Sequence, residues 1–178
     1  MSRSVENLDS FFMEKHLALV TMCNNEGINL VTFFTTRDPW TQAKLWRQDK
    51  TSEHISKAIE FLKDEKAFFL ADVLNSVGVQ YGRWATDCLP GQSYHQLGLA
   101  SDNCIKVGNK FIWNEDDEFF YLYDRYSEIA ESLGLTCGHT WKKKDSYHIQ
   151  LGKGDLVDTY GWAGLDQIMK VKWQRRSQ

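Results

Sequence analysis

The sequence lacks the features that mark membrane-spanning, disulfide-stabilised and nucleic-acid-binding proteins. It has no long run of apolar residues, so we expect no transmembrane segment. Its four cysteines, at positions 23, 88, 104 and 137, form no CxxC pair and no short-spaced framework, which argues against a zinc knuckle or a disulfide scaffold. The formal net charge of -3 offers no basic face, so we expect no nucleic-acid partner.

Proline is scarce as well, with 2 residues among 178, whereas 42% of the residues are hydrophobic and 13% are aromatic. This composition argues against disorder. The length predicts one domain over residues 1–178. Charged residues interrupt residues 1–20, so we expect no signal peptide and synthesis in the cytoplasm.

The predicted elements mix helices and strands without βαβ alternation. Residues 30–36, 97–105 and 147–151 are expected to form strands, and Asp38-Pro39 is typical of a helix start. Apolar residues spaced by three or four predict one long helix over residues 51–77. This order favours an α+β fold with a small antiparallel sheet and flanking helices.

Histidine is rare enough to narrow the search for a metal site, because the chain has only five. His16 and His54 lie in predicted helices beside Lys and Glu, and we expect both on the surface. Of the other three histidines, His95 and His148 are the candidates, together with the acid Asp102, which a loop and a short strand could bring back towards His95. Zinc takes imidazole nitrogen and carboxylate oxygen at about 2.0–2.2 Å and keeps an open position in catalytic sites. Spacing alone leaves open that both histidines are structural.

Asp145 lies three residues before His148, where its carboxylate could reach a water activated by the same metal. That is the position of a general base. The alternative is an ordinary solvated acid, because three lysines precede it in the sequence.

Residues 93–102 (SYHQLGLASD) resemble the SxHxxGxAxD signature of the peptidase M15 group, which contains zinc D-Ala-D-Ala carboxypeptidases, L-alanyl-D-glutamate endopeptidases and many phage endolysins. Residues 90–95 (PGQSYH) are similar to the PGQSxH lead-in of this group, and residues 145–148 (DSYH) to its (D/E)xxH element. Residues 36–46 resemble its (S/T)xR…Q…LY stretch. Residues 133–141 resemble its LGLxxGGxW stretch, although GHTW stands where the group has GGxW.

The resemblance implies the fold of the D-Ala-D-Ala carboxypeptidase and Hedgehog-like proteins, with one zinc ion per chain in a groove over the sheet. Residues 51–77 would then be an insertion, since many members have only a short loop there. The implied zinc ligands are His95, Asp102 and His148, with Asp145 as catalytic base and Arg37 as a cation near the metal. The implied residues around them, touching substrate or orienting the ligands, are Ser93, Gln92, Trp141 and His139, the last of which could line the groove or be exposed.

The resemblance also implies a function, namely hydrolysis of stem peptides in bacterial peptidoglycan. The LGL…GxxW…DxxH ending is most similar to the endopeptidases that cleave L-Ala-D-Glu, with D,D-carboxypeptidase action as the alternative. A catalytically inactive cell-wall-binding protein is a third possibility, which the carboxylate of Asp145 argues against. We expect a monomer that reaches the periplasm or cell wall after release or delivery, as a phage lysis enzyme or an antibacterial effector.

Overall fold

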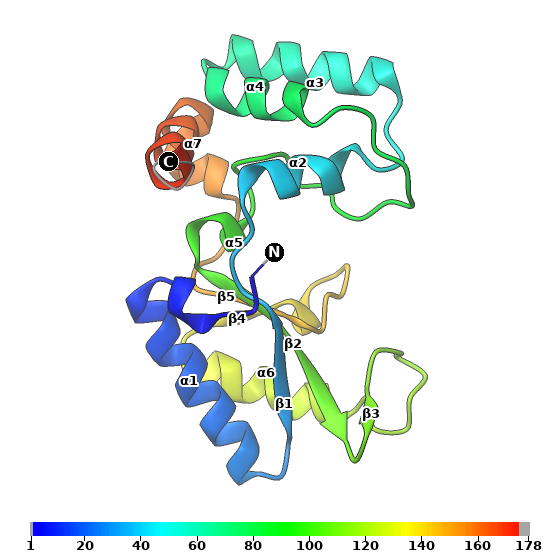
Figure 1. The fold of residues 1–178 in the computed structure, drawn as a ribbon. Helices are drawn as coiled ribbons and strands as arrows, with labels where there is room; N and C mark the ends of the chain where they lie inside the picture. Colours follow the sequence, from blue (N-terminus) through cyan, green and yellow to red (C-terminus); the bar gives the residue numbers. More distant parts are fainter. Residues whose placement is uncertain (1, 175–178) are drawn as a thin grey trace. The chain divides into compact units, whose positions relative to one another are not determined.

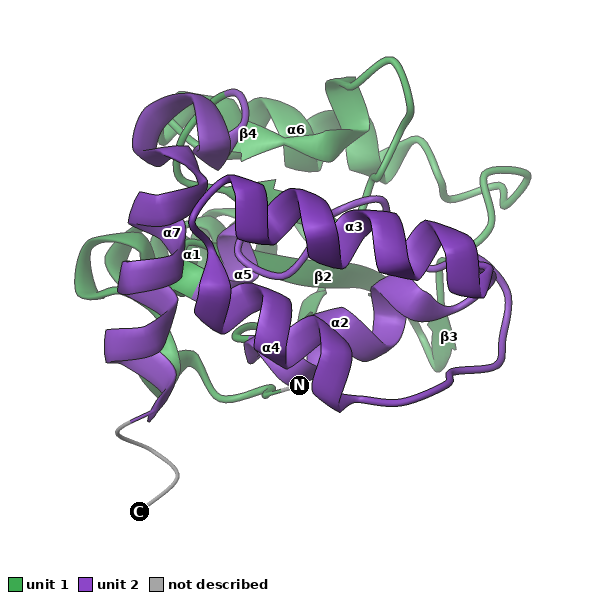
Figure 2. Ribbon diagram, turned by 90° about the horizontal axis from the view of Figure 1, so that it is seen from above, with its two compact units in different colours: residues 1–36, 97–153 green, residues 37–96, 154–178 purple. Residues whose placement is uncertain are grey.

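The computed structural model describes residues 2–174 (Figure 1). These residues form two compact units, each built from two separate stretches of the sequence (Figure 2). Unit 1 contains residues 1–36 and 97–153, and unit 2 contains residues 37–96 and 154–178. Whether the two units fold as the single domain expected from the length stays a prediction.

Unit 1 is built on an antiparallel sheet in which the strands follow the order β1-β2-β5-β4, with β3 paired to β2. Its strands are β1 (Leu30–Phe34), β2 (Ala100–Val107), β3 (Lys110–Phe111), β4 (Thr136–Cys137) and β5 (His148–Gln150). The α+β class with a small antiparallel sheet is confirmed. Strands β1, β2 and β5 lie where the sequence predicts strands, whereas β4 was not predicted.

Two helices of unit 1, α1 (Ser10–Asn25) and α6 (Leu122–Ser132), cover one face of this sheet (Figure 1). Asp9 caps α1 by accepting hydrogen bonds from the backbone N–H groups of Phe11 and Phe12, which would otherwise lack intrahelical partners. A short 3-10 helix, η1 (Val5–Asn7), precedes α1. The core between helices and sheet includes Phe12, Leu19, Ile105, Tyr126, Ile129 and Ile149.

His16 is fully buried on α1, so its expected place on the surface is wrong. Its Nε2 lies 3.0 Å from Thr32 Oγ1 and its Nδ1 lies 3.1 Å from Ser101 Oγ. The helical period explains the burial, because Phe12, His16, Leu19 and Cys23 form the buried stripe of α1. His54 is exposed, as expected.

Unit 2 is helical and contains α2 (Pro39–Arg47), α3 (Ser52–Asp64), α4 (Phe68–Ser76) and α7 (Leu156–Gln174), together with the first three residues of α5 (Tyr94–Leu97). As predicted, Asp38 caps α2 and Pro39 occupies its first turn. Gly161, with φ of 64°, kinks α7. Among residues 2–174, no helix is long and apolar enough to cross a membrane.

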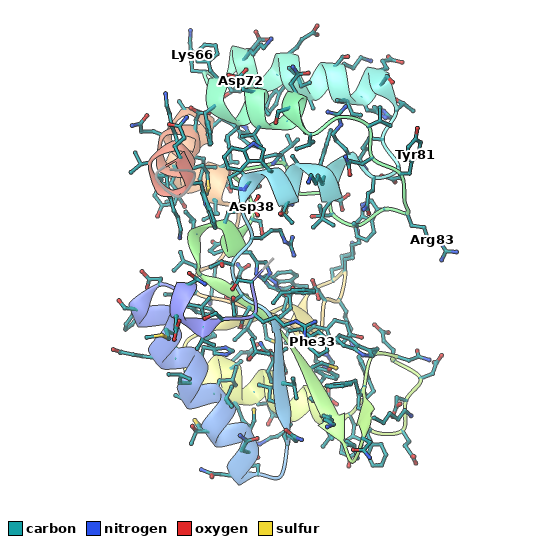
Figure 3. The ribbon with its side chains drawn as sticks, viewed as in Figure 1. Phe33, Asp38, Lys66, Asp72, Tyr81 and Arg83 are labelled. Carbon is teal, nitrogen blue, oxygen red and sulfur yellow. The ribbon has the colours of Figure 1, made fainter. Side chains whose placement is uncertain are left out.

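The single helix predicted over residues 51–77 is wrong, because the chain forms two packed helices there, α3 and α4. The break falls at Lys66, whose φ of 64° is left-handed (Figure 3). The amphipathic period continues on both sides of the turn, so periodicity alone does not reveal it. The N-terminus of α4 instead receives its cap from far along the chain, since Asp166 accepts a hydrogen bond of 2.8 Å from the Leu70 N–H.

The burial of His16 predicts a measurable pH dependence of stability. Burial lowers its pKa to about 4, below the value of about 6.5 expected in the unfolded chain. Between about pH 6.5 and pH 4, His16 binds a proton in the unfolded state but stays neutral in the folded state. The free energy of unfolding therefore falls by about 3 kcal/mol as the pH falls through this range. Urea denaturation between pH 7 and 4 should show this loss for the wild type and a flatter profile for His16→Gln. The exposed His54→Gln is the control. Equal slopes for His16→Gln and the wild type would contradict the prediction.

Candidate metal centre

Three side chains form a group that could hold a metal ion: His95, Asp102 and His148. One ligand atom from each lies within 4.8 Å of the others. Asp102 comes from β2, His148 from β5 and His95 from α5, which ends three residues before β2 begins. These are the three residues that the sequence predicts as ligands.

The pairing of β2 with β5 sets the distance between two of these side chains. Asp102 is the direct antiparallel partner of His148, so both side chains lie on the same face of the sheet. His148 Nδ1 lies 3.1 Å from Asp102 Oδ1. Two ligand atoms at zinc bond lengths of about 2.0–2.1 Å in tetrahedral geometry would be about 3.3 Å apart. The pair therefore fits zinc with little movement.

The neighbours of Asp102 on β2 face the other way. Ser101 contacts His16, and Asn103 Nδ2 donates to Tyr126 Oη at 3.2 Å. Because side chains alternate along a strand, these flanking polar residues serve the interior beneath the helices. They therefore do not set the polarity on the face that carries Asp102.

Gln150 orients the ring of His148. Its Oε1 lies 3.0 Å from His148 Nε2, and its Nε2 donates to the Gly152 carbonyl at 3.1 Å. The amide oxygen thus faces the ring, so Nε2 carries a hydrogen and Nδ1 is the ring nitrogen that faces Asp102. Gln150 was not predicted from the sequence, although its place two residues after His148 on a strand put it on the same face.

The His148 ring lies in an electrostatic environment that favours a cation. Burial alone would lower its pKa, yet the pKa is raised, because the hydrogen bond and charge of Asp102 outweigh that effect, with further contributions from Asp145 and Gln150. The same negative groups that favour a proton on this ring would favour a metal ion in its place.

His95 is held in a loop that one buried glutamine closes. Gln96 Oε1 accepts hydrogen bonds from the backbone N–H groups of Gly91 at 2.9 Å and Ser93 at 3.3 Å. Ser93 is itself buried, and its carbonyl accepts from the Gln96 N–H. Gln92 accepts from Leu89 N–H and donates to Asp155. Gln96 was also not predicted, because nothing in its spacing separates it from an ordinary helical glutamine.

Arg37 is anchored within unit 2. Its backbone N–H donates to the His95 carbonyl at 3.3 Å, and its Nη1 donates to Gln42 Oε1 at 2.9 Å. Gln42 in turn donates to the Cys88 carbonyl at 2.7 Å. The guanidinium is therefore held by the first turn of α2, and the backbone of Arg37 lies beside that of a candidate ligand.

Asp145 and Trp141 belong to the segment that leads into β5. The His148 N–H donates to the Asp145 carbonyl at 3.1 Å, which closes a turn between these two residues. The ring centroids of Trp141 and His148 lie 5.3 Å apart, and Trp141 is 37% exposed. His139 is buried in the 3-10 helix η2 (Gly138–Thr140), so the alternative that it is exposed is wrong.

The comparison with protein families identifies the same segment. Residues 88–151 match the peptidase M15 model described as D-alanyl-D-alanine carboxypeptidase. The resemblance seen in the motifs is thereby confirmed over these residues, which include the three candidate ligands and Asp145. The match covers less than half of the chain and leaves out Arg37.

Solved structures that are similar to the chain include an endopeptidase, a D,D-pentapeptidase and an LD-carboxypeptidase. The L-Ala D-Glu endopeptidase ChiX of Serratia marcescens has 14% identity and a TM-score of 0.47, with 90% of this chain and 91% of that chain covered. A mutant of the vancomycin-resistance D,D-pentapeptidase VanY, from a VanB-type cassette and in complex with zinc, has 16% identity and a TM-score of 0.44, with coverage of 82% and 73%. The LD-carboxypeptidase LdcB has 14% identity and a TM-score of 0.46, with coverage of 93% and 64%. No curated protein matches the chain.

The role of Gln150 can be tested by metal affinity. Gln150→Leu removes the acceptor that fixes the His148 ring, and we expect zinc affinity to fall about tenfold or more, as is usual when a partner of a metal-bound histidine is lost. Competition with a chromogenic chelator measures the affinity, and a thermal melt checks the fold. Gln80→Leu is the control, since Gln80 bonds to the Val77 carbonyl in unit 2. Unchanged affinity in Gln150→Leu would show that the ring needs no such support.

Proposed function

We propose that this chain is a zinc-dependent peptidoglycan hydrolase that cleaves the L-Ala-D-Glu bond of the stem peptide. The observation that carries the proposal is the group formed by His95, Asp102 and His148, which lies inside the segment matching a peptidase M15 model. Asp145 precedes the last of these residues by a single turn.

The donor set suits zinc. Two imidazoles and one carboxylate are a ligand set of catalytic zinc sites, in which the fourth position stays open. The 3.1 Å separation of His148 Nδ1 from Asp102 Oδ1 and the Gln150 acceptor behind the ring support this assignment. A bound zinc ion would polarise the scissile carbonyl and lower the pKa of a water molecule towards about 7.

The chain's own residues supply the proton transfers and the substrate contacts. The Asp145 carboxylate takes a proton from the attacking water and passes it to the leaving amine. Arg37 offers two parallel N–H groups to a substrate carboxylate or to the developing oxyanion. Trp141, with its partly exposed ring beside His148, provides an apolar surface for the stem peptide.

The choice of bond rests on sequence. The LGL…GxxW…DxxH ending resembles the endopeptidases, and it supports L-Ala-D-Glu cleavage. D,D-carboxypeptidase action is the second candidate, which the description of the matching family model favours. An inactive cell-wall-binding protein is less consistent with the chain, because metal binding requires no carboxylate at Asp145.

We further propose that the protein acts as a monomer in the periplasm or cell wall. Release through a membrane lesion during phage lysis and delivery as an antibacterial effector are both consistent with this site of action.

The metal and the base can be tested together. We expect about one zinc ion per purified chain by elemental analysis, lost in His148→Ala and retained in Asp145→Asn. Asp145→Asn should lower kcat/KM on peptidoglycan by about 100-fold or more, because it removes the proton acceptor. Asp116→Asn is the control, because Asp116 is an exposed acidic residue in a loop. Wild-type activity in Asp145→Asn would remove the base from the mechanism.

The bond can be assigned by mass spectrometry of digested muropeptides. L-Ala-D-Glu cleavage leaves disaccharide-L-Ala and a peptide that begins with D-Glu, whereas D,D-carboxypeptidase action on a pentapeptide releases free D-Ala. We expect the first pair of products. Free D-Ala as the product would overturn the endopeptidase assignment and keep the hydrolase.

A further inference from the structure

A chain of three hydrogen-bonded polar side chains, two of them buried, ends at the residue that follows Asp145. His139 Nε2 lies 2.9 Å from Asp124 Oδ1, and His139 Nδ1 lies 2.8 Å from Ser146 Oγ. His139 and Ser146 are 6% and 3% exposed, whereas the Asp124 side chain is 71% exposed at the start of α6. Ser146 directly follows Asp145 in the sequence. The chain of hydrogen bonds therefore runs from the surface of unit 1 to the residue beside the proposed base.

The chemistry of the partners assigns the proton positions. A carboxylate can only accept, so Nε2 of His139 carries the hydrogen that Asp124 receives. In the neutral ring Nδ1 is then an acceptor, and the Ser146 hydroxyl donates to it. The ring is also held by aromatic neighbours, with its centroid 6.2 Å from Tyr123 and 5.9 Å from Phe120. Ser146 is thus bonded to a ring with little freedom to move.

An Asp, a His and a Ser in this order resemble a serine-hydrolase triad, yet the geometry argues against nucleophilic catalysis. Ser146 is buried, so a substrate carbonyl has no approach to its hydroxyl. The ring is also used in the opposite sense, because the nucleophile of such a triad bonds to Nε2 and the acid to Nδ1. The three residues form a support and do not attack a substrate.

The segment from Gly138 to His148 also makes backbone contacts with Asp145. The Asp145 N–H donates to the Gly138 carbonyl at 2.9 Å. A Cβ at Gly138 would overlap the Asp145 carbonyl oxygen, so only glycine permits this approach. The same carbonyl oxygen accepts from the His148 N–H. Backbone contacts thus hold both the N–H and the carbonyl of Asp145, and the Ser146 hydroxyl bond holds the side chain of the residue that follows.

We propose that His139, through Ser146, is a positioning residue that aims the Asp145 carboxylate at the reacting centre. The inference rests on the proposed function, because it assigns a support to the proposed base. Loss of the bond between His139 and Ser146 would leave the candidate metal ligands in place but would let the Asp145 carboxylate adopt several orientations. This change lowers kcat more than it weakens substrate binding.

The first test is Ser146→Ala, which removes the hydroxyl and adds no bulk. We expect kcat to fall about tenfold, with KM and zinc content within about twofold of wild type. Ser127→Ala is the matched control, because Ser127 is also a buried serine of unit 1 and its hydroxyl bonds to a helix carbonyl, that of Asp124. A kcat within about twofold of wild type in Ser146→Ala would overturn the inference.

A double-mutant comparison separates positioning from general stability. If Ser146 acts through Asp145, Ser146→Ala should cause no further loss in the Asp145→Asn background. The same loss in both backgrounds would assign Ser146 a merely structural role and would overturn the inference. If Asp145→Asn by itself leaves the activity unchanged, the proposed role of Asp145 as the base is wrong. That result is distinct from a failure of the positioning role of His139 and Ser146.

An activity-independent measurement completes the test. In the metal-free protein, hydrogen exchange at the Asp145 amide, followed by NMR, should be about tenfold faster in Ser146→Ala than in the wild type and unchanged in Ser127→Ala. Equal exchange in Ser146→Ala and the wild type would overturn the inference even if the rate fell.

Discussion

The register between β2 and β5 is the constraint on which the candidate site depends. It makes Asp102 and His148 direct partners, so residues 46 positions apart in the chain share one face of the sheet. A slip of one residue would turn one of them towards the helices and separate the pair. Gln150, two residues further along β5, keeps its amide against the His148 ring for the same reason.

The opposite face of the same strands explains why this register is secure. Ser101 and Asn103 point beneath α1 and α6, where they meet His16 and Tyr126. Buried polar groups are costly unless they are hydrogen-bonded, so these bonds penalise any other register. The burial of His16 and the position of Asp102 are thus two results of one alternation along β2.

A second constraint is the turn from Gly138 to Ser146. It joins a glycine that tolerates the close approach of Asp145 to a histidine that bonds Ser146. This segment places Asp145 three residues before His148, and the His148 N–H donates to the Asp145 carbonyl. Within unit 1, the proposed base Asp145 and the candidate ligand His148 are therefore positioned by local backbone contacts, and the strand pairing adds Asp102.

Much of this organisation could be predicted from the sequence, because it depends on local pattern or spacing. The cap and proline that start α2 and the strands around residues 30–34 and 148–150 follow from residue types at short range. The three candidate ligands were implied by the resemblance of their motifs to the peptidase M15 group. The prediction of one long helix over residues 51–77 was wrong because an amphipathic period persists across a turn, and the second half of that segment is capped by Asp166 from α7.

The sequence by itself determined which residues could bind a metal and which carboxylate stands beside the last of them. Only the tertiary structure decided that His16 is interior, that Gln150 bonds the His148 ring and Gln96 closes the loop of His95, and that His139 is a buried partner of Ser146 and Asp124. The physical reason is that the type of each side chain and its spacing from its neighbours can be read directly from the sequence. The hydrogen-bond partner of a side chain, in contrast, depends on how segments far apart in the sequence pack together.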